Sequence, residues 1–599
     1  MKFILFAICL YVSFCECFDD GAVLCAIKSS TNIGTLRSSQ SPYIQGWDCS
    51  DAFLATTSIC KWTGVTCSTS NTTVASLVFP KNLITGSITN TIGDFQAIEM
   101  IQLSMNSIRG SIPNSLSKLK TLKTFDISSC LIVGTIPAEL GFMKSIQSIN
   151  LADNLISGSI PSTLGYLSSL KSLILQGNSL SKSIPALLFL NTSGSAASLN
   201  VIDFSYNPLT GTLPSAIGNL KNLTMLSIKG GSLAGTLPSS LGNLANLQTL
   251  QLSANELSGS IPLALSTLKS LQLLTIDQNN FNSTLPAFLG VLSKLSYLSV
   301  QNNSFYGLVP LSWGNLRNLT SLSVHKNLLS GLIPSFLGGL SLLTQCNLYE
   351  NKFRGVLPLE MSRMLKLTSL KLYRNALNGT IPTYIGRLTK LTTIDLRENS
   401  FIGMLPSAMS SLVKLSSLML GRNRLTGSIP LFLTSLQRLK ILYLDSNSYT
   451  GRVPSSLSLN TQLGQIYLHN NRLVGQIPAE LCASSILTTF KSYGNPNITC
   501  FPSCMLSMKA LSSAGFNPGV PLCYPSPAPT SKPTVNPTPA PYPVPTVTPT
   551  VSPSIIVREF VTFIAQQEMV NIDMATFIAD QALQLAFRQV CRDTVLTQY

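Results

Sequence analysis

The sequence has little of what most enzymes build active sites from. Only two of its 599 residues are histidine, and only 11% are charged. So few imidazoles leave little material for histidine acid/base chemistry or for histidine-built metal centres. We therefore expect no enzyme, no cofactor and no metal site.

Long apolar runs are also scarce. Lys2 precedes an uncharged apolar run from Phe3 to Phe14, and Cys15-Glu16-Cys17 follows it. This run is shorter than the about 20 residues that span a bilayer, which predicts a signal peptide at 1–17 and a secreted chain. No other stretch reaches 18 uncharged apolar residues, so we expect neither a transmembrane helix nor a lipid anchor.

Cysteine is unevenly distributed. Eleven remain after the predicted cleavage, in two groups of four and three single positions: Cys25, Cys49, Cys60, Cys67; Cys482, Cys500, Cys504, Cys523; and Cys130, Cys346, Cys591. In an oxidising compartment each group can close into disulfides, whose pairings the spacing leaves open. Cys130 and Cys346 are predicted to be buried thiols. Cys591 would then be left to link two chains as a homodimer; the alternatives are a reduced thiol, pairing with Cys25 or Cys49, or a role in a domain missing from the sequence.

A repeat of 24 residues fills the middle of the chain. The template LxLxxNxLxGxIPxxLGxL runs from 74 to 481 in seventeen units, with a weaker eighteenth unit around Asn495 and Pro502. One insertion around 191–195 breaks the register. The proline of the template falls at 113, 137, 161, 185, 214, 238, 262, 286, 310, 334, 358, 382, 406, 430, 454 and 478, and Thr89 takes the first slot.

Each part of the template has a physical role. Alternating leucines predict a short strand with one buried face, and stacked units then form a long parallel sheet. The asparagine seven residues before each proline can satisfy backbone groups of neighbouring turns. Cys130 and Gly231 occupy two of these asparagine slots, so we expect a local weakness near Gly231. The proline is predicted to open a short helical turn on the convex side.

These motifs carry a resemblance. The G-x-I-P element, the segment Ala22 to Lys28, Trp47, and Cys60-Lys61-Trp62-Thr63-Gly64-Val65-Thr66-Cys67 resemble plant-type leucine-rich repeat proteins. That family includes receptor-kinase ectodomains, receptor-like proteins, polygalacturonase inhibitors and leucine-rich-repeat extensins. The resemblance implies an α/β solenoid, right-handed and curved, with a long parallel sheet on the concave face and short 3-10 turns on the convex side. It also implies a Cys60–Cys67 disulfide and binding of peptides, proteins or glycans.

The remaining segments complete the predicted domain organisation. Residues 18–73 form an N-terminal cap, 74–481 the repeats, and 482–524 a C-terminal cap. Residues 525–554 are rich in proline and threonine, which predicts an extended linker, either O-glycosylated or unmodified. Residues 555–599 regain hydrophobicity and predict amphipathic helices that pack on a partner, self-associate, or begin a truncated domain.

The candidate binding residues come from the outward-facing slots of the strands, which lie thirteen, eleven, nine and eight residues before each proline. These slots hold mostly small or plain polar residues in the first nine repeats and change character from the tenth, where aromatic and charged residues recur. Tyrosine and arginine supply large rigid contact area and forked donors, which favours recognition over a merely soluble face. The candidates are Tyr297, His325, Lys326, Tyr349, Glu350, Lys371, Tyr373, Arg374, Arg397, Glu398, Arg422, Tyr443, Asp445, Tyr467 and His469, with Asp395, Lys491 and Tyr493 on the same face.

Eight sequons mark candidate N-glycosylation sites: Asn71, Asn191, Asn222, Asn282, Asn302, Asn318, Asn378 and Asn497. The sequence as a whole predicts an extracellular or cell-surface protein that binds a protein, peptide or matrix glycan on its concave face, without nucleic-acid partners. The alternatives are a structural matrix protein attached to polysaccharide and an inhibitor of a secreted glycan hydrolase. Asp395 and Glu398, the conceivable glycosidase pair, are expected on a solvated face unsuited to catalysis.

Overall fold

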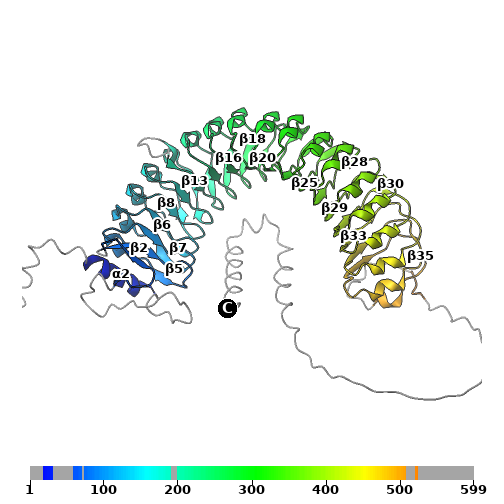
Figure 1. Cartoon of the computed structure of the whole chain (residues 1–599), viewed down its shortest axis with the longest axis horizontal. Helices are drawn as coiled ribbons and strands as arrows, with labels where there is room; N and C mark the ends of the chain where they lie inside the picture. The colour runs from blue at the N-terminus through cyan, green and yellow to red at the C-terminus, as the bar shows by residue number, and fades with distance from the viewer. Residues whose placement is uncertain (1–17, 32–58, 71–72, 191–197, 507–519, 524–599) are drawn as a thin grey trace, which may run out of the picture. The chain divides into compact units, whose positions relative to one another are not determined.

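The computed structural model describes residues 18–31, 59–70, 73–190, 198–506 and 520–523, which form a solenoid of stacked repeats (Figure 1). Residues 524–599 belong to a separate unit. The predicted signal peptide, the Pro/Thr tract and the tail with Cys591 lie outside the described residues, as do Cys49, Asn71 and Asn191. No described helix is long and apolar enough to cross a membrane.

One sheet runs the length of the solenoid, with one strand per repeat. Strands of successive repeats pair in parallel at identical slots, so Leu250 lies beside Leu226 and Leu274, and all three are fully buried. The strands are β1 (Val65–Cys67), β2 (Val74–Val78), β4 (Met100–Gln102), β6 (Thr124–Asp126), β8 (Ser148–Asn150), β10 (Ser172–Ile174), β13 (Val201–Asp203), β15 (Met225–Ser227), β17 (Thr249–Gln251), β19 (Leu273–Thr275), β21 (Tyr297–Ser299), β23 (Ser321–Ser323), β25 (Gln345–Asn347), β27 (Ser369–Lys371), β29 (Thr393–Asp395), β31 (Ser417–Met419), β33 (Ile441–Tyr443), β34 (Gln465–Tyr467) and β36 (Thr489–Lys491). This is the predicted parallel sheet on the concave side (Figure 1).

Each proline begins a short 3-10 turn on the convex side, as predicted. Pro334, for example, precedes η12 with an extended backbone, and its carbonyl accepts the N–H of Leu337. The turns are η1 (Asn90–Asp94), η2 (Asn114–Lys118), η3 (Ala138–Phe142), η4 (Ser162–Tyr166), η5 (Ala186–Phe189), η7 (Ser215–Asn219), η8 (Ser239–Asn243), η9 (Leu263–Thr267), η10 (Ala287–Val291), η11 (Leu311–Asn315), η12 (Ser335–Gly339), η13 (Leu359–Arg363), η14 (Thr383–Arg387), η15 (Ser407–Ser411), η16 (Leu431–Ser435), η17 (Ser455–Leu459), η18 (Ala479–Ala483) and η19 (Ser503–Leu506).

A second set of short parallel sheets, which the sequence analysis did not predict, lies between the concave strand and the proline. The glycine of the template ends many of these strands with positive φ, such as +80° at Gly355, which explains its recurrence. The strands are β3 (Thr85–Ser87), β5 (Ser107–Ser111), β7 (Leu131–Val133), β9 (Ser157–Gly158), β11 (Ser179–Leu180), β12 (Lys182–Ser183), β14 (Leu209–Gly211), β16 (Ser232–Gly235), β18 (Glu256–Gly259), β20 (Asn280–Phe281), β22 (Tyr306–Gly307), β24 (Leu328–Leu332), β26 (Lys352–Gly355), β28 (Ala376–Leu377), β30 (Ile402–Gly403), β32 (Arg424–Leu425), β35 (Val474–Gly475) and β37 (Asn497–Ile498).

The asparagine ladder is present. The amide oxygen of Asn154 accepts the backbone N–H of Ile132 at 3.0 Å. Its amide nitrogen donates to three backbone carbonyls of its own and an earlier repeat at 2.9 to 3.1 Å. At the Gly231 rung that acceptor is missing, and the N–H of Leu209 donates to the carbonyl of Asn207 at 2.7 Å instead. At the Cys130 rung the thiol donates weakly to the carbonyl of Leu103 at 3.4 Å.

Both ends of the stack are closed by caps. At the N-terminal end, helix α2 (Phe18–Ser30) buries Asp20, whose carboxylate accepts the backbone N–H groups of Val74 and Gln96. Strand β1 pairs antiparallel with β2 and so covers the first edge of the sheet.

Disulfides reinforce both caps. The Cys60–Cys67 bond that the resemblance implies is present. At the C-terminal end the pairings are Cys482–Cys504 and Cys500–Cys523. Cys130 and Cys346 are buried thiols, as predicted, and burial raises the pKa of Cys346 to about 12.

Candidate functional site

The concave face of repeats ten to seventeen is built from slots that the fold leaves outward. Within each strand the buried residue alternates with outward residues, and the third residue after the strand has positive φ. Lys326, Glu350, Arg374, Glu398 and Arg422 occupy this turning slot, with φ between 51° and 55°. Because strands of successive repeats align slot by slot, residues 24 apart become neighbours.

Aromatic rings stack along this face. The ring centroids of His325 and Tyr349 lie 3.9 Å apart, and those of Tyr349 and Tyr373 lie 4.3 Å apart, with nearly parallel planes in the second pair. The guanidinium of Arg397 then lies 5.4 Å from the Tyr373 ring and 5.7 Å from the Tyr443 ring. Arg397 therefore joins two aromatic groups that sequence reasoning treated as separate pairs.

The second aromatic group continues toward the C-terminal cap. The Tyr443 and Tyr467 centroids lie 4.2 Å apart, and the ammonium of Lys491 lies 5.0 Å from the Tyr467 ring. His469 stacks on Tyr493 at 4.5 Å. We name the whole row the aromatic ribbon: His325, Tyr349, Tyr373, Arg397, Tyr443, Tyr467, His469 and Tyr493.

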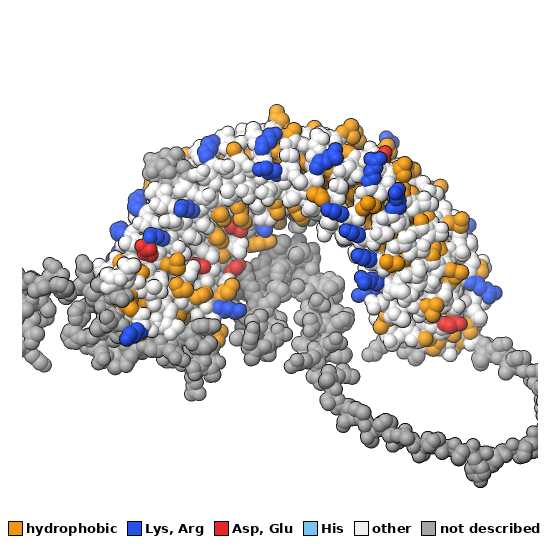
Figure 2. Space-filling model, in the orientation of Figure 1, with side chains coloured by type: hydrophobic (Ala, Val, Ile, Leu, Met, Phe, Trp, Pro, Cys, Tyr) orange, Lys and Arg blue, Asp and Glu red, His pale blue; other side chains and the backbone are white. Residues whose placement is uncertain are grey.

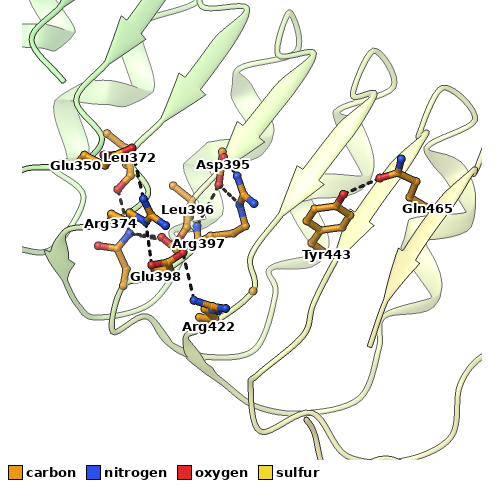
Figure 3. Close-up of polar contacts among 12 residues, drawn as sticks. Glu350, Leu372, Arg374, Asp395, Leu396, Arg397, Glu398, Arg422, Tyr443 and Gln465 are labelled. Atoms are coloured by element: carbon orange, nitrogen blue, oxygen red, sulfur yellow. Dashed lines mark hydrogen bonds and ion pairs between the residues drawn. The ribbon is translucent and has the colours of Figure 1, made fainter. Parts of the chain in front are cut away.

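A row of ion pairs borders the ribbon (Figure 3). Arg374 lies between two carboxylates, 3.0 Å from Glu398 and 3.8 Å from Glu350, and Arg422 lies 3.6 Å from Glu398. These pairs are largely exposed, so each contributes little to stability, but together they hold the side chains in place. In Figure 2 basic side chains follow the inner edge of the C-terminal limb.

Arg397 also holds a buried acid. Asp395 is 2% exposed, and two nitrogens of Arg397 donate to its two oxygens at 2.9 and 2.7 Å (Figure 3). The expectation that Asp395 lies on a solvated face is therefore wrong. Its oxygens are engaged by a forked cation, which suits a structural role and not that of a catalytic acid.

Two of the predicted binding residues are buried, whereas sequence reasoning placed all of them on an open face. His325 is 7% exposed because the Tyr349 ring covers it. Asp445 is 8% exposed because Gly421 has no side chain, and the Asp445 carboxylate fills the space beside it. His469 Nε2 lies 3.7 Å from that carboxylate.

Burial shifts the titration of the ribbon. It lowers the pKa of His325 to about 3, with Lys326 and Lys371 adding to the effect. Burial also lowers the pKa of His469 in spite of nearby Asp445. It raises the pKa of Tyr443 to about 12. His325, His469 and Tyr443 are therefore neutral at physiological pH, and the charge of this face comes from the lysines, arginines and carboxylates beside them.

The remaining candidates are more isolated. Tyr297 is 37% exposed and makes no ring contact with another described residue. Neither Lys326 nor Lys371 has a carboxylate within ion-pair distance among the residues that the structure describes. Within the same ranges, no three His, Cys, Asp or Glu side chains gather in a way that would hold a metal ion.

Sequence reasoning missed one feature of this face. In repeats ten to fifteen the residue before the concave strand carries a hydroxyl that donates to the backbone carbonyl 24 residues earlier, as from Thr344 to Thr320 at 3.0 Å. This hydroxyl row comprises Ser296, Thr320, Thr344, Thr368, Thr392 and Ser416. The signal was a Ser or Thr every 24 residues, and the row ties adjacent strands together directly beside the ribbon.

The stacked 24-residue repeats and their concave parallel sheet together define a leucine-rich-repeat solenoid. Family models match as Leucine rich repeat at 365–425, as Leucine rich repeat N-terminal domain at 18–68, and as Leucine Rich Repeat at 145–167, 198–220, 246–268 and 318–340. Comparison with curated proteins gave no match.

Solved structures extend the comparison. The chain is similar to the plant peptide hormone receptor RGFR1 in complex with RGF2, at 30% identity over 73% of this chain and 72% of that one, with a TM-score of 0.66. It is also similar to the Arabidopsis receptor kinase HAESA in complex with the peptide hormone IDA and the co-receptor SERK1, at 27% identity, 81% and 82% coverage and a TM-score of 0.68. The chain belongs to the plant-type leucine-rich repeat proteins.

A bacterial structure shows how far the fold alone reaches. A leucine-rich-repeat protein of Leptospira interrogans matches at 26% identity over 68% of this chain and 92% of that one, with a TM-score of 0.50. The same solenoid therefore serves in distant organisms, and function has to be argued from the side chains.

Proposed function

We propose that this chain is an extracellular recognition protein that binds its ligand non-covalently on the concave face of repeats ten to seventeen. The observation that carries the proposal is the aromatic ribbon, which joins eight side chains across seven repeat intervals into one row. Tyrosine and arginine dominate the energetics of protein interfaces. Preordered side chains also lose little conformational entropy when a ligand binds.

The stacking favours a polypeptide ligand. Both faces of the Tyr349 ring are covered by His325 and Tyr373, and both faces of the Tyr373 ring by Tyr349 and Arg397. A sugar that binds by stacking needs an open ring face. The rings instead expose their edges and hydroxyl groups, and lysines lie beside them. The hydroxyl groups can form hydrogen bonds with peptide groups, and the lysines can pair with acidic side chains. The similar plant receptors are described in complex with peptide hormones.

Two alternatives rest on the charge of the chain. A net charge of +16 would also suit attachment to an anionic matrix polysaccharide, as a structural protein or as an inhibitor of a glycan hydrolase. Such attachment would depend on total charge and fall steeply with salt. Binding on the ribbon would depend on particular hydroxyls.

The test is a binding panel of secreted proteins, peptides and matrix polysaccharides against the full chain. Tyr349→Phe with Tyr373→Phe keeps the stack and removes only two hydroxyls, so folding is preserved and ligand affinity should fall about tenfold. The control, Thr249→Ser with Gln251→Asn, changes two outward-facing slots of the strand in the eighth repeat and should leave affinity unchanged. Equal loss in both variants, or binding to polysaccharide alone, would place recognition elsewhere.

A further inference from the structure

The second set of sheets carries an apolar patch on a surface separate from the concave face. It lies in repeats ten to twelve, over the four-stranded sheet β22-β24-β26-β28 and the first residues of η11 and η13. We name as the apolar patch Leu308, Leu311, Leu332, Val356 and Leu359, which are 66%, 78%, 66%, 58% and 70% exposed. Tyr306 and Leu328, at 50% and 44%, lie on the same strands.

The fold does not require apolar residues there. Leu308, Leu332 and Val356 occupy the slot two residues before the proline. In the first nine repeats that slot always holds serine or threonine: Ser87, Ser111, Thr135, Ser159, Ser183, Thr212, Thr236, Ser260 and Thr284. Wherever the next repeat has the template glycine, the side chain lies beside it, as Leu308 does with Gly331 and Thr236 with Gly259. A small hydroxyl therefore satisfies the slot, and the change to leucine and valine adds only exposed apolar surface.

Contiguous exposed apolar surface of this kind marks an interaction site in a soluble protein. Single exposed leucines are ordinary, but here five large aliphatic side chains gather in three successive repeats. They begin in the repeat where the concave face also becomes aromatic. The aromatic concave face and the apolar patch thus occupy the same part of the solenoid but lie on different surfaces of it.

The charges around the patch indicate what covers it. Lys352 and Arg354 lie on β26 between Leu332 and Val356, and Arg354 is the register partner of Leu332. Both are exposed, and neither has an ion-pair partner among the described residues. Arg363 lies at the end of η13, so the single carboxylate of Glu360 in that turn is outnumbered.

Self-association is disfavoured by this rim. In a two-fold dimer each patch faces its own copy, which would bring Lys352 and Arg354 close to the same cations of the second chain. Like charges brought together at a desolvated interface repel each other and oppose association. A partner with carboxylates around an apolar face would instead pair with these cations.

The sequons frame the same surface. Asn282 and Asn378 are exposed and both lie four residues before a proline, in the ninth and thirteenth repeats. Between them that slot holds Tyr306, Ser330 and Arg354, so no N-linked glycan can be attached at that slot. Glycans at the two ends would leave the patch open as a window between them.

We propose that the apolar patch is a second docking surface, which binds a protein partner through an apolar face bordered by aspartate or glutamate. Leu308, Leu311, Leu332, Val356 and Leu359 supply the contact area, and Lys352 and Arg354 select the acidic border. Binding there leaves the concave face open, so the chain can hold two partners at once.

Two synthetic amphipathic helical peptides test the proposal with the full chain. One has a leucine face bordered by glutamates, and the other has the same face bordered by lysines. The wild type should bind the glutamate peptide at least tenfold more tightly than the lysine peptide. Lys352→Glu with Arg354→Glu should reverse that preference.

The apolar contact is tested with the residues that the chain itself uses elsewhere. The triple variant Leu308→Ser, Leu332→Ser and Val356→Thr should keep the melting temperature of the wild type. Its affinity for the glutamate peptide should be at least tenfold lower. The control Thr212→Ser, Thr236→Ser and Ser260→Thr should change nothing. No binding of the glutamate peptide by the wild type, or equal binding by the triple variant, overturns the proposal. The proposal is also overturned if the wild type sediments as a dimer and the triple variant does not. The same holds if the wild type binds phosphatidylcholine vesicles and the triple variant does not.

Discussion

The first nine repeats and the last eight share one backbone and differ in what they display. Both halves have the same parallel strands, the same 3-10 turns and the same buried leucines. On the concave face the first half shows residues such as Ser148, Asn150 and Ala152, whereas the second shows the aromatic ribbon. On the flank the first half shows serine and threonine, and the second shows the apolar patch.

This difference separates folding from function along the chain. A repeat fixes its core, its ladder and its turn, and the remaining slots are free to vary. In the first half these variable slots hold mostly small or plain polar residues, so this half shows which residues the fold itself requires. Any departure in the second half, such as Tyr349 at a slot where the eighth repeat has Ser253, then needs an explanation beyond folding.

The largest effect is expected from core substitutions, which test whether the cores of the two halves are equally stable. Leu151→Ala and Leu396→Ala remove fully buried core side chains from the fourth and fourteenth repeats. Each should destabilise its region by about 2 to 5 kcal/mol, because a cavity remains. Local hydrogen exchange measures this, since a solenoid can open locally without unfolding as a whole. A loss confined to one half would mean that the scaffolds differ.

The next effect should appear only in the second half. Arg397→Ala leaves the buried Asp395 carboxylate without its forked partner and breaks the contact between the two aromatic groups. We expect destabilisation of about 2 to 3 kcal/mol, together with weaker ligand binding. Asp395→Asn in the Arg397→Ala background should restore much of the stability in chemical denaturation. No difference between the single and double variants would contradict a buried ion pair as the cause.

Acid should weaken the second half first. The pKa of His325 is lowered to about 3, so the unfolded chain, with its ordinary value near 6.5, binds the proton more readily. The stability from neutral His325 is fully present above about pH 6.5 and declines as the pH falls toward 3, by at most about 1.4 kcal/mol per pH unit. His325→Phe keeps a ring on Tyr349 and should flatten this slope in melts between pH 7 and 4. If the pH dependence of the melting temperature is unchanged in this variant, groups other than His325 cause it.

The smallest effect concerns the first half, at the missing rung. A Cβ at Gly231 would lie 3.0 Å from the Asn207 carbonyl oxygen and 3.0 Å from Asn255 Oδ1, so any side chain requires a small adjustment. Gly231→Asn and Gly231→Ala share that contact, but only asparagine offers the N–H of Leu209 an acceptor. We expect the asparagine variant to be more stable by about 1 kcal/mol. Equal melting temperatures would remove the ladder as a source of stability.

Much of the fold could be predicted because the repeat fixes it. Residues 24 apart fall at matching positions, so the core, the ladder, its gap at Gly231 and the outward slots follow from counting. The second set of sheets was missed because its strands are two to five residues long and many of them contain glycine, which is not typical of a strand.

The site was predicted in its residues but not in its contacts. Counting placed His325, Tyr349 and Tyr373 in one column. It could not show that Arg397 reaches both Tyr373 and Tyr443, because that depends on the side-chain rotamer. The burial of Asp445 likewise depends on the space left by Gly421, one repeat away.

The most direct test of the central claim is hydroxyl-radical footprinting of the full chain with and without the ligand that the binding panel identifies. Tyrosine is present in both halves, so each half serves as the control of the other. We predict protection of Tyr349, Tyr373, Tyr443 and Tyr467, and unchanged labelling of Tyr166 and Tyr206, which are 40% and 53% exposed. Protection of Tyr206 without protection of the ribbon would contradict the account.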